Sequence, residues 1–308
     1  MKEVLLIGGG GTLGTYTAEE LLRLGHKVDV ICLEDLTSDN ENLTYYKAYA
    51  TIEYLEELFR RNRYDGIVNF LLYRNDKDYP PFHALLSQNT DHLIFLSSYR
   101  VYADLQHPIT EEAPLLIDVE KDPVFRENED YALSKARSER YLKDNPYPKN
   151  WTVVRPVISF SGRRLDVVMA SKTEVVDAVR EGRAVKVSLE SKNLTAGLDW
   201  AGNTGKMIAH LLFKKETIGE AYTLSSAQNL TWGEIADIYT EVLGTRFEWV
   251  PGDFSGEKLK TRFRWKYDRL FDRSIDNSKV LAATGLTPAD FKSIKEGIII
   301  ELKKLGVL

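Results

Sequence analysis

The chain has 308 residues, 43% of them hydrophobic, which is enough to bury a large core in one or two domains. Its formal net charge of −5 is opposite to the basic face that nucleic-acid binding normally needs, so we expect no nucleic acid as a partner. A single cysteine, Cys32, excludes an intrachain disulfide and fits a reducing compartment, and the apolar runs are too short to cross a bilayer, so we expect a cytoplasmic protein without membrane contact.

In the first half of the chain, predicted strands alternate with predicted helices. Apolar runs rich in β-forming residues predict strands over residues 2–7, 27–33, 66–72, 92–97 and 151–154. Apolar residues at helical spacing predict helices over residues 12–24, 51–62 and 131–143. This alternation predicts an α/β fold of the Rossmann type, a doubly wound parallel sheet with helices on both faces.

The second half has a different pattern. Helices are predicted over residues 167–181, 204–213 and 232–243, joined by short strand-like pieces such as 221–224. We place a boundary near residue 160. Residues 1–160 are then a dinucleotide-binding domain, against which residues 196–214 pack, and residues 161–308 are a smaller mixed α/β region that binds the substrate.

A glycine-rich turn follows the first predicted strand, with glycines at positions 8, 11 and 14. Gly8 permits a sharp turn, Gly11 lets the backbone approach a pyrophosphate, and Gly14 lets the helix pack close to the strand. The helix that follows presents free N–H groups and the positive end of its dipole to phosphates. The turn therefore predicts a dinucleotide cofactor.

The residue that holds the adenosine ribose normally lies about 20 residues after such a turn. Glu34 has this spacing from Gly14, and Asp35 is its neighbour. No arginine lies beside the turn in the sequence to receive a 2′-phosphate, so we expect NAD, with NADP as the alternative. Solvated loop charges are the competing interpretation of this acidic pair.

A tyrosine and a lysine, Tyr131 and Lys135, lie four residues apart on one face of a predicted helix. A nearby ammonium group lowers the pKa of a phenol, so such a tyrosine can take a proton from a substrate alcohol. Ser97 and Ser98, at the end of the fourth predicted strand, are candidates to hold the same substrate oxygen. A tyrosine–lysine pair at this spacing is common, and it gains weight from following the glycine turn and the strand-end serines in the required order.

These motifs together resemble the extended short-chain dehydrogenases/reductases, the NAD-dependent epimerase/dehydratase family. The similar segments are the glycine turn, residues 95–102, residues 109–114 and the Arg-Pro pair at 155–156. The resemblance implies that Ser98 is the catalytic serine, Tyr131 the base and Lys135 its partner. The cofactor site expected from these motifs consists of Gly8, Gly11, Thr12, Leu13, Gly14, Glu34, Leu71, Ser97, Tyr131, Lys135 and Pro156.

The second half is similar to a narrower group of that family, the epimerase-like proteins that include chloroplast RNA-binding members. The segments concerned are residues 194–201, 219–226, 230–232 and 273–279. The resemblance implies an enzyme that epimerises, dehydrates or reduces a sugar or nucleotide sugar, in a chain that could form a homodimer. A carbonyl reductase for a small molecule without a nucleotide is the first alternative, and a non-catalytic RNA-binding protein is the second.

Arginines and aromatic residues are concentrated between residues 262 and 273. Arginine suits the oxygens of a diphosphate, and we expect Arg262 and Arg273 to bind the substrate, while packing in a core or pairing with Asp268 and Asp272 is the competing interpretation. The five histidines show no metal-ligand spacing, so we expect no metal.

Overall fold

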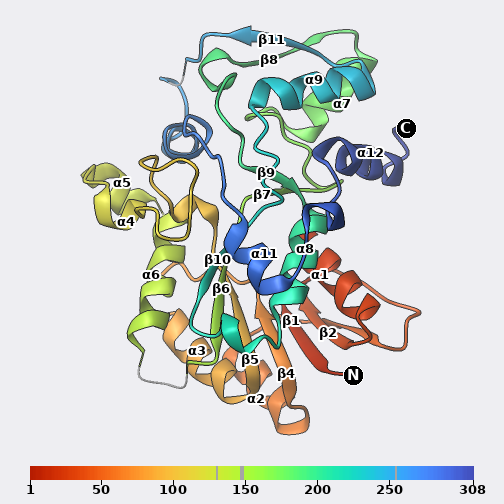
Figure 1. Ribbon diagram of the computed structural model, residues 1–308, viewed down its shortest axis with the longest axis vertical. Helices are drawn as coiled ribbons and strands as arrows, with labels where there is room; N and C mark the ends of the chain where they lie inside the picture. The colour runs from red at the N-terminus through yellow and green to blue at the C-terminus, as the bar shows by residue number, and fades with distance from the viewer. Residues whose placement is uncertain (130, 146–148, 254) are drawn as a thin grey trace.

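A computed structural model describes residues 1–129, 131–145, 149–253 and 255–308 of the chain. A seven-stranded, fully parallel sheet forms the lower half of the molecule in Figure 1. Its strand order is β10-β6-β5-β4-β1-β2-β3. The strands are β1 (Glu3–Ile7), β2 (Lys27–Cys32), β3 (Leu43–Lys47), β4 (Tyr64–Asn69), β5 (Thr90–Leu96), β6 (Trp151–Pro156) and β10 (Ala221–Leu224).

Helices cover both faces of this sheet because its strands are apolar on both sides. In β1, Val4 and Leu6 pack into a cluster with residues of α1 (Thr12–Arg23) and α8 (Ala201–Leu211). Leu5 and Ile7 face the opposite side. That side is covered by α2 (Ile52–Arg61), α3 (Tyr79–Gln88) and α6 (Ala132–Asp144).

The direction in which the chain adds strands reverses at β1. The chain runs from β1 through β2 to β3 on one side and then returns to place β4 on the other side of β1. In open α/β sheets, ligands bind outside the carboxyl ends of the strands at such a reversal. This topology positions the glycine turn, which follows β1, at the centre of that edge.

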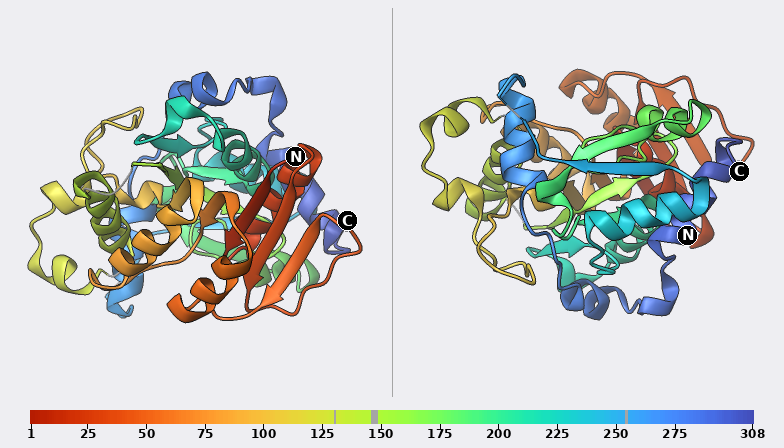
Figure 2. Two further views of the ribbon diagram at one scale, coloured as in Figure 1. Left: turned by 90° about the horizontal axis from the view of Figure 1, so that it is seen from below. Right: turned by 90° about the horizontal axis from the view of Figure 1, so that it is seen from above.

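The upper half of the molecule is built around a separate apolar core. Two short parallel pairs of strands lie here, β8 with β11 and β7 with β9. Seen from above, in the right panel of Figure 2, the first pair crosses the top of the molecule beside α9. The elements are β7 (Ile158–Phe160), β8 (Ala184–Ser188), β9 (Leu198–Trp200), β11 (Arg246–Val250), α7 (Lys172–Arg180), α9 (Trp232–Leu243) and α12 (Ile294–Lys304).

Several short helices border the space between the two halves. They are α4 (Leu116–Val119), α5 (Pro123–Asn128), α10 (Leu259–Arg264) and α11 (Ser278–Thr284). A π-helical turn, Trp265–Arg269, continues α10, and 3₁₀ turns occur at Tyr99–Val101, Leu189–Ser191, Lys215–Thr217 and Pro288–Asp290. Within the described residues, no helix is long and apolar enough to cross a membrane.

One predicted helix begins later than the sequence pattern indicates. The pattern predicts a helix from residue 167, whereas α7 begins at Lys172. Val167 and Ala170 form an isolated bridge instead, and Val168 between them has a positive φ of 55°. Ser171 then caps α7 in a capping box with Glu174, which sets the start of the helix.

The second half of the chain also contributes to the first-half sheet. β10 extends that sheet beside β6, and α8 packs along α1. α8 lies within residues 196–214, the segment expected to pack against the first domain. The edge strand β10 adds a second return, so the two halves are joined over several elements.

Candidate active site

The glycine turn joins β1 to α1 in a conformation that only small residues permit. Gly8 has φ +74°, and its N–H donates to the carbonyl of Ile31 at 2.8 Å. A Cβ on Gly14 would overlap the backbone of Gly9, so α1 can lie this close to the turn only with glycine there. A Cβ on Gly11 would meet nothing within 4 Å, because this residue borders open space.

The N-terminus of α1 faces that open space. Gly11 is the N-cap residue, and no side chain caps the helix there. Thr12, Leu13 and Gly14 of the first turn line the cleft, together with Gly8 and Gly11. Uncapped N–H groups and the helix dipole form an arrangement that suits a pyrophosphate.

A cleft of about 750 Å³ lies between the carboxyl edge of the large sheet and the upper half of the molecule. Four strand-end or loop segments of the first half and several segments of the second half meet in it. Its lining consists of Gly8, Gly11, Thr12, Leu13, Gly14, Phe70, Leu96, Ser97, Ser98, Tyr99, Arg100, Tyr131, Pro156, Val157, Ile158, Ser159, Arg163, Arg164, Asp166, Arg264 and Asp268.

Both candidate serines follow β5 and lie in the cleft lining. The Ser98 hydroxyl caps the 3₁₀ turn that follows by accepting the N–H of Arg100 at 3.2 Å. The Ser97 hydroxyl donates to the buried carboxylate of Glu139. That carboxylate is also paired with the buried guanidinium of Arg155 at 2.6 Å. Of the two serines, only Ser98 donates its hydroxyl hydrogen to no described residue, so that hydrogen is available to a ligand.

Tyr131 lies at the N-terminus of α6 and lines the same cleft as Ser98. Glu129 holds this helix end, because its carboxylate accepts the backbone N–H of Tyr131 at 2.9 Å and that of Leu133 at 3.2 Å. The same carboxylate pairs with Arg100 at 3.3 Å. The guanidinium of Arg100 lies over the Tyr131 ring, 5.1 Å from its centroid.

Lys135 lies one helical turn after Tyr131 and is 2% exposed. Its ammonium donates to the carbonyl of Leu71 at 2.9 Å and to that of Leu96 at 2.5 Å, at the ends of two neighbouring strands. Burial lowers the pKa of Lys135 to about 7, against the opposing charge of Glu139. Lys135 does not itself line the cleft but lies directly below the strand ends that form its floor.

Glu34 follows β2 and lies beside the glycine turn, where a Cβ on Gly10 would overlap its carboxylate. It is not part of the cleft lining. Its carboxylate pairs with Arg163 at 3.4 Å, and both side chains are about half exposed. The sequence shows no arginine near this turn, but the fold brings Arg163 to it from 129 residues away.

The structure places Arg262 and Arg273, which the sequence analysis expects to bind the substrate, outside the cleft lining. Arg262 is exposed and lies outside the cleft lining. Arg273 is 1% exposed, and its guanidinium donates to the carbonyls of Tyr102 and Tyr267 at 3.0 Å each. The arginines that do line the cleft are others.

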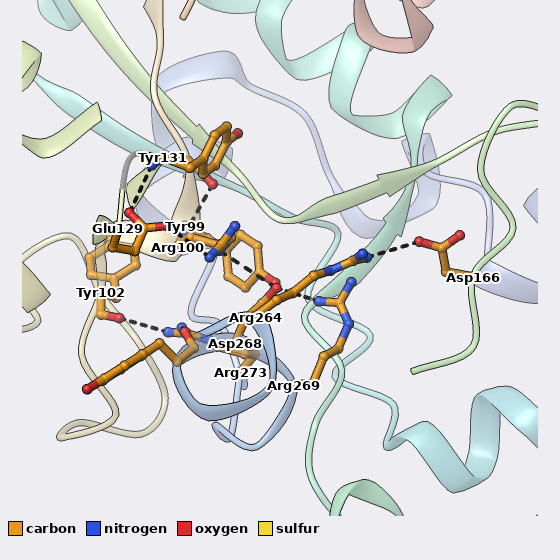
Figure 3. A network of polar contacts seen from close by, with 12 residues as sticks. Tyr99, Arg100, Tyr102, Glu129, Tyr131, Asp166, Arg264, Asp268, Arg269 and Arg273 are labelled. Atoms are coloured by element: carbon orange, nitrogen blue, oxygen red, sulfur yellow. Dashed lines mark hydrogen bonds and ion pairs between the residues drawn. The ribbon is translucent and has the colours of Figure 1, made fainter. Parts of the chain in front are cut away.

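Asp268 lines the cleft and has two arginine partners, of which Arg100 also lines the cleft (Figure 3). It accepts a hydrogen bond from the Tyr99 hydroxyl and pairs with Arg269 at 2.6 Å and with Arg100 at 3.7 Å. Burial acts to raise the pKa of Asp268, but the charges of Arg269, Arg100 and Arg273 outweigh it and hold the pKa at about 2. Asp268 is therefore ionised at neutral pH.

Arg264 takes the place that the sequence analysis gave to Arg262, two residues away on α10. It lines the cleft and pairs with Asp166 at 3.3 Å. Asp166 also pairs with Arg164 at 2.7 Å. Burial, together with the charges of Arg269 and Arg164, lowers the pKa of Arg264 to about 10.

Groups of three or more metal-ligating side chains placed to hold an ion are absent from the described part of the chain. The site residues that the sequence analysis missed are Arg100, Arg163, Arg164, Asp166, Arg264 and Asp268. Arg100 is two residues from Ser98, which was a usable signal. The others belong to segments far apart in the sequence.

No protein-family model matches the sequence, and no curated protein matches it either. Solved structures are similar in fold. A dTDP-glucose 4,6-dehydratase from Bacillus anthracis, solved with NAD, matches 98% of this chain and 96% of its own with a TM-score of 0.75 and 18% identity.

Two epimerases are similar to the same degree. A UDP-glucose 4-epimerase from Thermotoga maritima, solved with UDP-glucose, has a TM-score of 0.71 and 16% identity over 99% of this chain and 98% of its own. An epimerase from Methanothermobacter thermautotrophicus has a TM-score of 0.73 and 17% identity over 99% of this chain and 92% of its own. The chain thus has the fold of the NAD-dependent epimerases and dehydratases, and the predicted Rossmann-type fold class is confirmed.

Proposed function

We propose that this chain is an enzyme that uses NAD, or alternatively NADP, to act on a hydroxyl or carbonyl group of a sugar or nucleotide sugar. Ser98, Tyr131 and Lys135 are its catalytic group in this proposal. The observation that carries it is that the glycine turn, Ser98 and Tyr131 line one cleft at the reversal point of the sheet.

The residues at the turn fit a dinucleotide. Gly11 leaves open space where a side chain would stand, and the uncapped N-terminus of α1 faces it. Glu34 lies beside the turn, where its carboxylate would accept hydrogen bonds from the ribose hydroxyls of a bound adenosine. When bound, the nicotinamide would supply the acceptor for the hydride that leaves the substrate carbon.

The chain's own residues then handle the proton and the oxygen. The Ser98 hydroxyl donates to the substrate oxygen and fixes its position. The Tyr131 oxygen takes the proton from the substrate hydroxyl as the substrate carbonyl forms, and returns that proton in the reverse step. Lys135, held by two strand-end carbonyls, has one further N–H among its three to offer to a ligand above the sheet.

The substrate class is supported by the similar structures, whose names include enzymes of UDP-glucose and dTDP-glucose. The identity of the sugar is open to direct assay.

The test is turnover by purified protein with NAD and a panel of UDP-glucose, UDP-glucuronate and dTDP-glucose, followed by proton NMR of the sugar. We expect Tyr131→Phe to lower turnover by about 10²- to 10⁴-fold, because it removes the proton acceptor, and to leave the Kd for NAD within about twofold. Tyr49→Phe is the matched control, since Tyr49 is 75% exposed and is not part of the cleft lining.

Two results would contradict the proposal. One is a Tyr131→Phe variant with wild-type turnover. The other is a protein that neither binds NAD or NADP nor converts any member of the panel.

A further inference from the structure

The positive charge of Arg100 lies at the proposed reaction site. Its guanidinium lies 5.1 Å from the centroid of the Tyr131 ring, and it lines the cleft two residues after Ser98. The side chain is 18% exposed, so it is largely withdrawn from bulk water. A substrate oxygen held between Ser98 and Tyr131 would therefore lie close to this charge.

The carboxylates around Arg100 hold it loosely. Glu129 is 3.3 Å away and Asp268 is 3.7 Å away, beyond the usual length of a charged hydrogen bond. The Nε of Arg100 is buried and has no hydrogen-bond partner among the described residues. This Nε is the atom that faces Asp268 at 3.7 Å, so the attraction there is one of charge and not of a hydrogen bond.

Arg264 is a second cation on the same wall of the cleft. Figure 3 shows it reaching past Asp268 toward Asp166, with Arg100 on the other side of Asp268. Asp166 is shared by Arg264 and Arg164, and Asp268 is shared by Arg269 and Arg100. Asp166 can thus neutralise only one of its two arginines, whereas Arg100 has Glu129 as a second carboxylate partner.

The cleft has a charge opposite to that of the whole protein. Its lining contains four arginines and two aspartates, with no lysine, glutamate or histidine. With the ion-pair partners just outside the lining, Arg269, Glu34 and Glu129, five arginines stand against four carboxylates, which leaves a formal excess of one positive charge. The chain as a whole carries −5. A positive cleft in an acidic protein favours an anionic ligand, because both Coulomb attraction and steering act on it there.

We propose that the substrate carries a carboxylate on the same sugar ring as the reacting hydroxyl, and that Arg100, assisted by Arg264, binds it. A diphosphate in the remote part of a nucleotide sugar would not need a cation over the Tyr131 ring, whereas a ring carboxylate beside the reacting carbon would. The planar guanidinium suits a carboxylate because it can donate two parallel hydrogen bonds. This inference rests on the proposed function, since it assumes that Ser98 and Tyr131 hold the reacting oxygen.

The test compares two probes that differ by one carboxylate, UDP-glucuronate and UDP-glucose, in calorimetric titrations with NAD at saturation. Free glucuronate and UDP are titrated in parallel to separate the carboxylate from the diphosphate. We expect UDP-glucuronate to bind about tenfold or more tightly than UDP-glucose, and Arg100→Gln to remove that preference without changing the Kd for UDP-glucose. Arg264→Gln should reduce the preference severalfold.

Arg262→Gln is the matched control, because Arg262 lies on the same helix as Arg264 but is exposed and outside the cleft. Arg100→Lys, which keeps the charge and loses the planar fork, should retain part of the preference and covers the case in which Arg100→Gln fails to fold. Melting temperatures of all variants report on folding.

Three results would overturn the inference. They are equal affinity of the wild-type protein for the two nucleotide sugars, no binding of either glucuronate probe, and an Arg100→Gln variant that weakens UDP and UDP-glucose as much as UDP-glucuronate. In each case, loss of turnover in Tyr131→Phe on a neutral sugar would still support the proposed function, so the two can fail separately.

Discussion

The two ends of the cleft are built by different means. At the glycine end, backbone atoms and one helix N-terminus form the surface, and the lining there contains no charged side chain from residue 8 to residue 14. At the arginine end, charged side chains form the surface, held by carboxylates that each serve two partners. The first end depends on the space between backbone segments, and the second depends on a balance of charges.

The two ends should therefore be disrupted by different kinds of substitution. A backbone surface fails when a side chain is added, because there is no room for it. A charge network fails when one member is removed, because the remaining members are left buried and unpaired. Substitutions at the two ends should thus differ in how much they lower the free energy of unfolding.

The largest effect is expected from Asp268→Asn. Asp268 is 4% exposed and is paired with Arg269 and Arg100, so among the described residues its loss leaves Arg269 without a counter-charge and leaves Arg100 with Glu129 alone. We expect a loss of about 3–5 kcal/mol in the free energy of unfolding, measured by urea denaturation at pH 7. Asp35→Asn is the control, because Asp35 forms an exposed pair with Lys47 and its loss should leave the free energy of unfolding nearly unchanged.

Asp268→Asn should also make the stability of the protein less dependent on pH in acid. The pKa of Asp268 is held at about 2, below the usual value of 3.8, so its contribution to stability is present above about pH 4 and is lost as the pH falls toward 2. Asp268→Asn should therefore have a flatter stability profile between pH 4 and pH 2 than the wild-type protein. A variant within about 1 kcal/mol of the wild type at pH 7 would contradict the charge-balance account.

At the glycine end, two substitutions should separate folding from binding. Gly14→Ala places a methyl group against the backbone of Gly9 and should cost about 3 kcal/mol of stability. Gly11→Ala places it in open space at a φ of −82°, which alanine tolerates, so stability should change by less than about 1 kcal/mol. The Kd for NAD, measured by calorimetry, should nevertheless rise at least tenfold in Gly11→Ala, because the methyl group fills the space left for the pyrophosphate.

A Gly11→Ala variant with wild-type affinity for NAD would show that the turn does not approach a phosphate. A Gly14→Ala variant as stable as the wild type would show that α1 can move away from the turn. Either result would break the contrast between the two ends.

The contrast also explains what the sequence could predict. The glycine end is contiguous, so its spacing alone predicted a strand, a turn and a helix that the structure contains at Glu3–Ile7 and Thr12–Arg23. The arginine end is assembled from segments such as Arg264 and Asp166, which are 98 residues apart. The sequence located the basic stretch, but helix geometry turned Arg264 toward the cleft and left Arg262 outside it.

Two regular elements of the first half were also missed for physical reasons. α3 begins Tyr-Pro-Pro, which resembles a loop, although proline is well tolerated in the first turn of a helix. β3 is an edge strand whose side chains are only partly buried, so it lacks the continuous apolar run that marked the inner strands. Both elements acquire their structure from packing against the sheet.

A smaller effect of pH is expected at Lys135, below the floor of the cleft. Burial holds its pKa at about 7, whereas the unfolded chain has the ordinary value of 10.5. Between these two values the unfolded state binds more protons, so this residue makes stability rise with pH. The wild-type free energy of unfolding should therefore gain about 2 kcal/mol from pH 7 to pH 9 relative to Lys135→Met, in parallel denaturation curves. Identical slopes in the two proteins would contradict a lowered pKa of Lys135 in the folded state.

The smallest change in stability is expected where the two halves of the chain meet over the glycine turn. Glu34 and Arg163 form an ion pair at 3.4 Å with side-chain exposures of 42% and 55%, and such exposed pairs contribute at most about 1 kcal/mol. Glu34→Gln should thus leave the melting temperature almost unchanged. Its effect should instead appear in cofactor choice, because the carboxylate that favours ribose hydroxyls and repels a 2′-phosphate is gone, and Arg163 is released to bind that phosphate. We expect the ratio of NADP to NAD affinity, measured by titration of both cofactors, to rise at least tenfold in Glu34→Gln and to fall back in Glu34→Gln/Arg163→Gln. An unchanged ratio in the single variant would mean that Glu34 lies beside the turn without contacting the adenosine, and that only the backbone of the glycine end recognises the cofactor.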